Sequence, residues 1–177
     1  ACHESAELCR DSVAGPTFRI YTNSDIIGVE LGGALKNVLA IGAGICEGMG
    51  FGDNTKAALL TRGLAEITRL GEALGAKRET FSGLSGVGDL MATSFSHLSR
   101  NLRVGLALGQ GASLQETLER IGQVAEGVPT TKAAVALADS TGVEMPIARE
   151  IHAVLFENRP AKDGLRNLMA RQWKDEV

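Results

Sequence analysis

The sequence predicts a mainly α protein, a multi-helix bundle preceded by one β-strand. From residue 24 onward, apolar residues recur at helical spacing in segment after segment. The only alternating stretch is Thr17–Thr22, and no second strand pattern follows it. Glycine contributes 22 of the 177 residues and aromatic residues only 4%, so the helices should pack closely through small side chains.

The composition argues against several classes of protein, including membrane-spanning and disulfide-rich ones. The chain is 44% hydrophobic and long enough for one well-packed domain, and no apolar run approaches the ~20 residues that span a bilayer. A net charge of −3 gives no general reason to expect nucleic-acid binding. Three cysteines do not form a disulfide framework, which favours a reducing, cytoplasmic location. Cys2, His3 and Cys9 fit no common zinc spacing, so no metal site is expected.

The first 22 residues have a different pattern from the rest. Residues 1–14 are predicted to form a short amphipathic helix, and Thr17–Thr22 a strand. A lone strand after a helix is typical of the end of a βαβ arrangement. We therefore interpret residues 1–22 as the last piece of a missing α/β domain, and residues 23–177 as a helical domain. The absence of an initiator Met agrees with a piece of a longer protein.

A long central helix is predicted from Asp25 to Cys46. It is apolar nearly all round, so it should run through the interior of the domain. Only three of its side chains after Ile26 are polar, and one of them is Lys36. A buried lysine is either paired or functional. Gly32 and Gly33 leave a bare flank beside Lys36, where another backbone or a ligand can approach, so helix packing and function both stay open.

Glycines, prolines and capping residues divide the rest of the chain. The glycine-dense segment Gly42–Gly52 is expected to be a loosened helix end and a tight loop. It follows a helix, unlike a dinucleotide-binding turn, which follows a strand. Further helices are predicted from Asn54 to Leu74, from Ser99 to Gly109, after a Ser113 and Glu116 capping box, from Pro129 to Gly142, from Pro146, and from Ala161.

Two later stretches carry candidate functional groups. A glycine-rich loop over residues 83–88 leads to Asp89 at a probable helix start, where the acid is either a cap or a buried group. Ser99, Arg100 and Asn101 place a hydroxyl, a guanidinium and an amide beside unpaired helix N–H groups, which suits phosphate. A plain serine cap with a solvated arginine is the alternative. We expect Lys36, Asp89 and the helix start at Ser99 to converge on one cleft.

With these stretches placed, the chain resembles the C-terminal helical domain of bacterial-type NAD(P)-dependent glycerol-3-phosphate dehydrogenase, from about Phe18 to Asp175. Six blocks in register are more specific than any one alone. The matching blocks are Phe18–Asn23, Gly28–Asn37, Thr61–Glu66, Gly86–Leu90, Ser99–Asn101 and Gly142–Ile147.

The resemblance implies an oxidoreductase that interconverts dihydroxyacetone phosphate and sn-glycerol 3-phosphate with NAD or NADP, for phospholipid precursor supply. Lys36 would be the catalytic proton donor and acceptor at the substrate C2 oxygen. The implied substrate-binding residues are Lys36, Asp89, Ser99, Arg100 and Asn101, and the implied cofactor contacts are Arg100, Val124 and Glu126. The partner is then a small phosphorylated substrate, and a homodimer stays open.

By the same resemblance, residues 1–22 are the remnant of a Rossmann-type NAD(P)-binding domain, and residues 23–177 are the substrate domain. The rest of the nucleotide-binding domain is absent from the chain, so the chain alone is expected to be inactive. Two alternatives stay open. Related 2- and 3-hydroxy-acid dehydrogenases also present a lysine after glycine on a central helix, but they lack the Ser-Arg-Asn phosphate cradle. A helical interaction or dimerisation module would not be stabilised by glycerol 3-phosphate.

Overall fold

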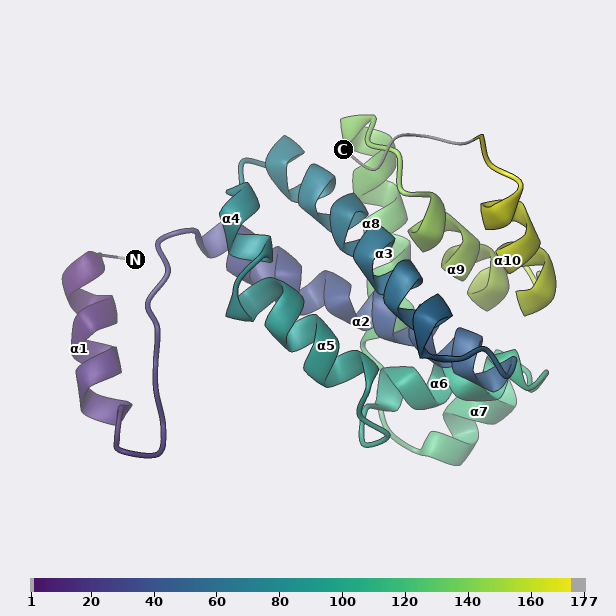
Figure 1. Ribbon diagram of the computed structural model, residues 1–177, viewed down its shortest axis with the longest axis horizontal. Coiled ribbons are helices and arrows are strands. Elements are labelled where there is room, and N and C mark those ends of the chain that lie inside the picture. Colours follow the sequence, from purple (N-terminus) through teal and green to yellow (C-terminus); the bar gives the residue numbers. More distant parts are fainter. Residues whose placement is uncertain (1, 173–177) are drawn as a thin grey trace.

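The computed structural model describes residues 2–172, and this part of the chain is built from helices. Figure 1 shows α2 running through the middle of a bundle formed by the later helices. The elements in order are α1 (His3–Val13), α2 (Ile26–Gly48), α3 (Asp53–Ala73), α4 (Arg78–Phe81), the π-helical turn η1 (Leu84–Gly88), α5 (Asp89–Ser94), α6 (Arg100–Gly109), α7 (Leu114–Ile121), α8 (Gly127–Thr141), α9 (Pro146–Phe156) and α10 (Ala161–Met169).

The predicted strand Thr17–Thr22 is not a strand. The β-type pairing described between residues 2 and 172 is a single isolated bridge between Gly15 and Phe18, with N···O distances of 3.0 and 3.1 Å. The residues after Phe18 lead without regular structure into α2. A strand requires a neighbouring strand for its backbone groups, and the described residues offer none. The helix before it, α1, stands apart from the bundle in Figure 1 and exposes Leu8 and Val13.

The central helix is as buried as predicted. Leu35, Val38 and Leu39 of α2 are each no more than 3% exposed. The carboxylate of Asp25 caps its start by accepting the Gly28 N–H at 2.9 Å, and it also accepts the Thr80 hydroxyl at 2.7 Å. Length and composition alone would suit α2 to a membrane, but 56% of its apolar window is buried by the rest of the protein. Its apolar surface is therefore covered as in a core helix.

The segment Gly42–Gly52 is not a loosened helix end, because α2 continues regularly to Gly48. A Cβ at Gly44 or Gly48 would collide with backbone carbonyl oxygens of α6, and a Cβ at Gly105 or Gly109 of α6 would collide with carbonyl oxygens of α2. The glycines therefore let the two backbones touch. Helix packing outweighs the low helix propensity of glycine at these positions.

Two other predicted helix starts shift by one or two residues, and one predicted loop is a helical turn. Helix α3 begins at Asp53 after Gly52, so Asn54 is not its cap. Residues 83–88 form the turn η1 where a loop was expected. Helix α8 begins at Gly127, two residues before Pro129. By contrast, the capping box of Ser113 and Glu116 at α7 is formed as predicted.

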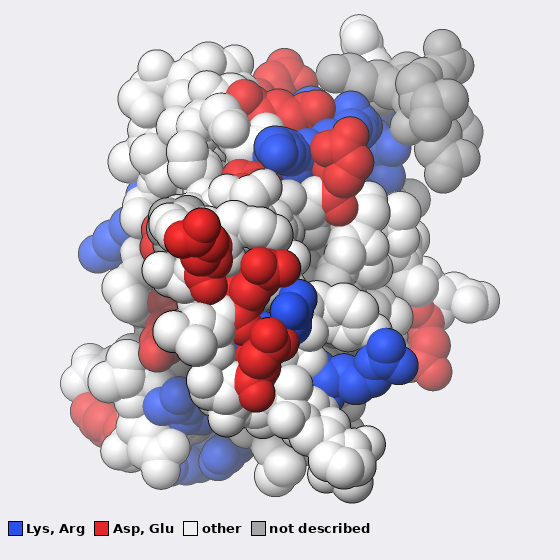
Figure 2. Space-filling model, turned by 90° about the vertical axis from the view of Figure 1, so that its left-hand side faces the viewer, with Lys and Arg blue, Asp and Glu red and all other residues white. Residues whose placement is uncertain are grey.

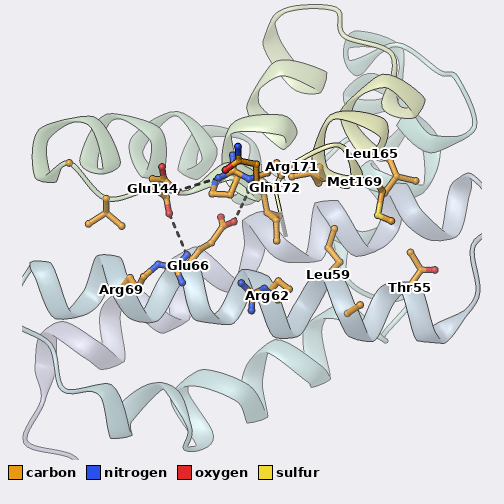
Figure 3. Close-up of a pocket in the computed structure, with 16 residues that line it drawn as sticks. Thr55, Leu59, Arg62, Glu66, Arg69, Glu144, Leu165, Met169, Arg171 and Gln172 are labelled. Atoms are coloured by element: carbon orange, nitrogen blue, oxygen red, sulfur yellow. Dashed lines mark hydrogen bonds and ion pairs between the residues drawn. The ribbon is translucent and has the colours of Figure 1, made fainter. Parts of the chain in front are cut away.

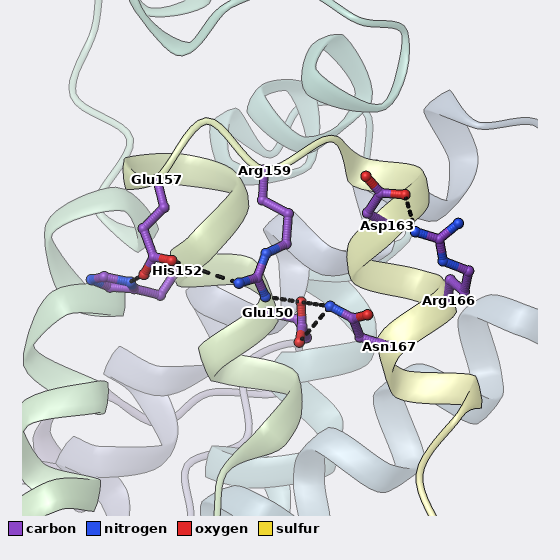
Figure 4. Close-up of polar contacts among 7 residues, drawn as sticks. All are labelled: Glu150, His152, Glu157, Arg159, Asp163, Arg166 and Asn167. Carbon is purple, nitrogen blue, oxygen red and sulfur yellow. Dashed lines mark hydrogen bonds and ion pairs between the residues drawn. The ribbon is translucent and has the colours of Figure 1, made fainter.

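Polar contacts join α9 to α10 at the end of the chain (Figure 4). Glu150 of α9 accepts hydrogen bonds from Arg159 at 2.7 Å and from Asn167 of α10 at 3.3 Å. Gly164 of α10 is buried beside Glu150 and Val154. On the face drawn in Figure 2, acidic and basic side chains are interspersed and form no continuous basic tract.

Candidate functional site

Lys36 is paired with Asp89. Its Nζ donates a hydrogen bond to Asp89 Oδ2, and the two side chains are 19% and 38% exposed. Thr93 Oγ1 donates a long hydrogen bond of 3.4 Å to the other oxygen of the same carboxylate. The helix neighbours of Lys36 are apolar or glycine, as the sequence indicates, but a carboxylate 53 residues away completes its surroundings. Of the two alternatives predicted for this lysine, paired or functional, the structure shows the pairing.

The two glycines beside Lys36 differ in what surrounds them. A Cβ at Gly32 would collide with the Ser85 carbonyl oxygen of η1, so Gly32 serves the packing of η1 on α2. A Cβ at Gly33 would have no neighbouring atom within 4 Å. Packing thus explains Gly32, and the open flank predicted for a ligand is found at Gly33.

The turn η1 places Asp89 against α2. Gly86 of η1 is buried, and a Cβ there would collide with the backbone of Phe81, whose ring lies in the core. The chain then enters α5 with Asp89 as its first residue. Leu90 is 2% exposed and anchors the start of α5 in the core. Asp89 is therefore a half-exposed counter-ion, neither the simple cap nor the fully buried acid considered from sequence.

The three residues at the start of α6 have different roles in the structure. Ser99 caps α6, because its Oγ accepts the Leu102 N–H at 3.3 Å. Asn101 is 7% exposed and uses both ends of its amide inside the protein. Its Nδ2 donates to Asn37 Oδ1 at 2.8 Å, and its Oδ1 accepts the Gly127 N–H at 2.9 Å. Arg100 is half-buried and forms no hydrogen bond or ion pair with any residue from 2 to 172.

Asn101 is the centre of a latch between three helices, which we define as the hydrogen-bonded set Asn37, Asn101 and Gly127. Asn37 follows Lys36 on α2, and its Nδ2 also donates to the Gly33 carbonyl at 3.2 Å. Gly127 is the first residue of α8, and Asn101 satisfies one of its otherwise unpaired N–H groups. This tertiary cap explains why α8 begins before Pro129. Sequence reasoning missed the roles of Asn37 and Gly127, although Asn37 is a polar residue in a buried helix.

The predicted cofactor loop directly precedes α8. Ala125 is 3% exposed and fixes the loop in the core, whereas Val124 is 69% exposed and Glu126 is also exposed. The latch therefore connects the helix of Lys36, the helix start of Arg100 and the end of the loop that carries Val124 and Glu126. Lys36 and Asp89 are in direct contact, and the latch joins their neighbourhood to Ser99 and Arg100.

A cavity of about 930 Å³ lies elsewhere, between α3, the connection from α8 to α9, and the end of α10. In Figure 3, Glu66 and Arg69 from α3 face Glu144 and Arg171 on the opposite wall. Glu66 caps α9 by accepting the N–H groups of Ile147 at 2.8 Å and Ala148 at 3.3 Å. No predicted site residue lines this cavity, and its buried carboxyl is occupied in capping, so the candidate site is the Lys36 region.

Within residues 2–172, no group of three or more His, Cys, Asp or Glu side chains is placed to hold a metal ion. Cys2 and Cys9 are exposed, Cys46 is buried, and all three are free thiols. Burial raises the pKa of the Cys46 thiol above its usual value, which keeps it protonated and unreactive.

Comparison with known proteins shows the family to which the chain belongs. The family model described as NAD-dependent glycerol-3-phosphate dehydrogenase C-terminus matches residues 25–166. The chain belongs to this family. The match confirms the resemblance inferred from the six sequence blocks, and it covers every candidate site residue named above.

Individual relatives agree with the family model. The chain is 54% identical over 98% of its length to a glycerol-3-phosphate dehydrogenase (NAD(P)+) from Thermoanaerobacter sp., and 53% identical over 98% to one from Lactococcus lactis. A crystal structure of glycerol-3-phosphate dehydrogenase from Coxiella burnetii matches 96% of the chain with a TM-score of 0.92 at 42% identity. The chain covers 53%, 51% and 52% of these three proteins, so it spans about half of their length.

Proposed function

We propose that the chain is the substrate-binding half of an NAD(P)-dependent glycerol-3-phosphate dehydrogenase. The whole enzyme would interconvert dihydroxyacetone phosphate and sn-glycerol 3-phosphate, and so supply a phospholipid precursor. The observation that carries this proposal is the Lys36–Asp89 pair beside the open flank at Gly33, joined by the latch to the helix start that bears Arg100. Lys36 and the guanidinium of Arg100, unpaired within residues 2–172, thus lie on two helices that the latch joins, which supports a shared site.

Lys36 would exchange the proton of the reaction. In reduction, its ammonium gives a proton to the C2 oxygen of the substrate, and the carbonyl becomes an alcohol. A nicotinamide cofactor held in part by Arg100, Val124 and Glu126 would supply the hydride for this reduction. In oxidation, the neutral amine of Lys36 takes the proton from the C2 hydroxyl. The carboxylate of Asp89 is the counter-ion for the ammonium and fixes the direction of its side chain.

Arg100 would bind the substrate phosphate. Guanidinium groups match phosphate oxygens in pairs of hydrogen bonds, and Arg100 forms no ion pair within the described part of the chain. It stands at the first turn of α6, where backbone N–H groups favour an anion. The Ser99 hydroxyl accepts a backbone N–H and still has its own hydrogen to donate. Asn101 would then act mainly through the latch, because both ends of its amide are already bonded.

The residues that would touch NAD or NADP are Arg100, Val124 and Glu126. They fit the edge of a dinucleotide, since the guanidinium is free for a phosphate and Val124 offers an exposed apolar side chain. The remaining half of the longer relatives would hold most of the cofactor.

A cytoplasmic location and a homodimer belong to the same proposal. Two exposed free thiols support the first, and exposed apolar side chains such as Leu98 support the second.

The test uses the full-length protein with dihydroxyacetone phosphate and NADH or NADPH. Lys36→Ala should lower kcat by on the order of 10² or more, as expected for an acid/base group. Arg100→Ala should mainly raise KM for the phosphorylated substrate. It should change kcat/KM for phosphate-free dihydroxyacetone little. Lys132→Ala, on α8, is the control for removing a lysine.

Three outcomes would overturn this proposal. Unchanged kinetics in Lys36→Ala or Arg100→Ala would remove that residue from the mechanism. Efficient turnover of a phosphate-free hydroxy acid would favour the related hydroxy-acid dehydrogenases. A protein that neither turns over nor is stabilised by glycerol 3-phosphate would be a helical interaction module.

A further inference from the structure

Lys56 is a buried lysine that the proposed reaction does not use. It lies in the first turn of α3 and is 6% exposed. Its Nζ donates to Glu47 Oε2 at the end of α2, at 2.7 Å, and lies 4.7 Å from the centroid of the Phe95 ring. Burying an ammonium is costly unless it is paired, so such a group is retained where its geometry matters.

Lys56 and its partner Glu47 both contact the connection between α5 and α6. This connection is residues 95–98, and it ends at Ser99, the cap of α6. The Phe95 ring faces the Lys56 ammonium, and His97 Nε2 lies 3.7 Å from Glu47 Oε1. The hydrogen bonds of the connection itself within residues 2–172 are local, such as Ser99 N–H to the Ser96 carbonyl at 2.9 Å. Lys56 and Glu47 therefore provide its polar attachment to α2 and α3.

The position of this attachment matters because Ser99 and Arg100 are only partly buried. The body of α6 is held by core residues such as Leu102 and Val104, and Asn101 is held by the latch. Ser99 and Arg100 precede these anchors and continue directly from the connection. The orientation of their backbone N–H groups and of the guanidinium thus depends on where residues 95–98 are held.

We propose that Lys56 is a positioning residue for the phosphate of the substrate. Together with Glu47 it holds Phe95 and His97 in place, and thereby orients the start of α6 that would bind phosphate. This inference rests on the proposed function, since it assigns a role within the same site. The Lys36–Asp89 pair is anchored separately, by α2 and by the buried Leu90 at the start of α5, so proton transfer at Lys36 depends on Lys56 less.

The first measurement is hydrogen exchange in the full-length protein, which does not depend on activity. Lys56→Met should speed amide exchange at residues 96–100 by on the order of tenfold, because local opening becomes easier. Lys56→Arg keeps the charge and the ring contact and should restore slow exchange. Phe95→Leu removes the half-exposed ring without leaving Glu47 unpaired, so it tests the same anchor if Lys56→Met folds poorly. Lys132→Met, which removes a lysine 4.3 Å from the Phe156 ring, is the matched control.

The second measurement is steady-state kinetics with glycerol 3-phosphate. Lys56→Met should raise KM several-fold and weaken competitive inhibition by inorganic phosphate in parallel, with kcat within about twofold of wild type. Lys56→Arg should reverse both changes. Unchanged exchange at residues 96–100, or a fall in kcat at constant KM, would overturn the proposal. No turnover by wild type would refute the proposed function instead, and the exchange data would still decide whether Lys56 anchors the connection.

Discussion

At the scale of single residues, Glu66 links folding to pH. Burial is the main cause that raises the pKa of its carboxyl from 4.5 to about 7, against the opposing effect of the N–H groups of Ile147 and Ala148 and of Arg69 and Arg171. A carboxyl whose pKa is raised in the folded state stabilises the fold fully at pH values below its pKa in the unfolded chain. That contribution is lost as pH rises through about 7. The shift corresponds to about 3 kcal/mol of unfolding free energy.

We therefore expect the wild-type protein to lose stability between pH 5 and pH 8 through this group. The side chain in Glu66→Gln cannot ionise, so the unfolding free energy of this variant should fall less over the same pH range. The difference from wild type should reach up to about 3 kcal/mol. Urea unfolding at the two pH values measures the difference, with the exposed Glu79→Gln as the control. Parallel pH dependence in wild type and Glu66→Gln would show that Glu66 is already ionised across this range.

At the scale of elements, the crossing of α2 and α6 depends on glycine. A Cβ at Gly105 would collide with the Ile41 carbonyl oxygen, which is backbone and cannot move alone. Gly105→Ala should therefore push the two helices apart and cost about 1–3 kcal/mol or more, as overpacking does. The latch lies on the same pair of helices, so this substitution should also disturb the contact between Asn37 and Asn101.

Gly33→Ala is the matched control for this prediction. It is the same substitution on α2, at a position where the new methyl group meets no atom within 4 Å. Higher helix propensity should make it neutral or stabilising by up to about 1 kcal/mol. Denaturant unfolding of both variants decides the matter. Equal stabilities for Gly105→Ala and Gly33→Ala would mean that the helices do not cross as closely as described.

At the scale of the whole molecule, we expect the 177-residue chain alone to have no measurable dehydrogenase activity. Hydride transfer needs a nicotinamide held against the substrate carbonyl, and the chain spans only about half of its relatives. Phosphate or sulfate should still bind weakly at Arg100, because that part of the site is local. Cofactor turnover by the purified chain, absent from its Lys36→Ala variant, would show that the other half is not needed.

The amino-acid sequence alone determined the helical class and the buried central helix, and it named Lys36 and Arg100 as candidate site residues. The inferences about helices succeed because helical periodicity, capping oxygens and prolines act within a few residues of one another. The capping box at Ser113 is formed as predicted for this reason, and Ser99 forms the helix cap that was the alternative to a phosphate cradle. The Thr17–Thr22 strand failed because alternation predicts a strand only when another strand is available to pair with it.

Only the tertiary structure decided which groups meet. Asp89 pairs with Lys36 across 53 residues, and Asn101 bonds Asn37 across 64, so neither contact has a local sequence signal. The glycines near the end of α2 predict a helix terminus because glycine lowers helix propensity. Only the close approach of α6 explains why the helix continues through them. Local chemistry specifies each element, whereas the partner of a buried charge or amide is set by how those elements pack.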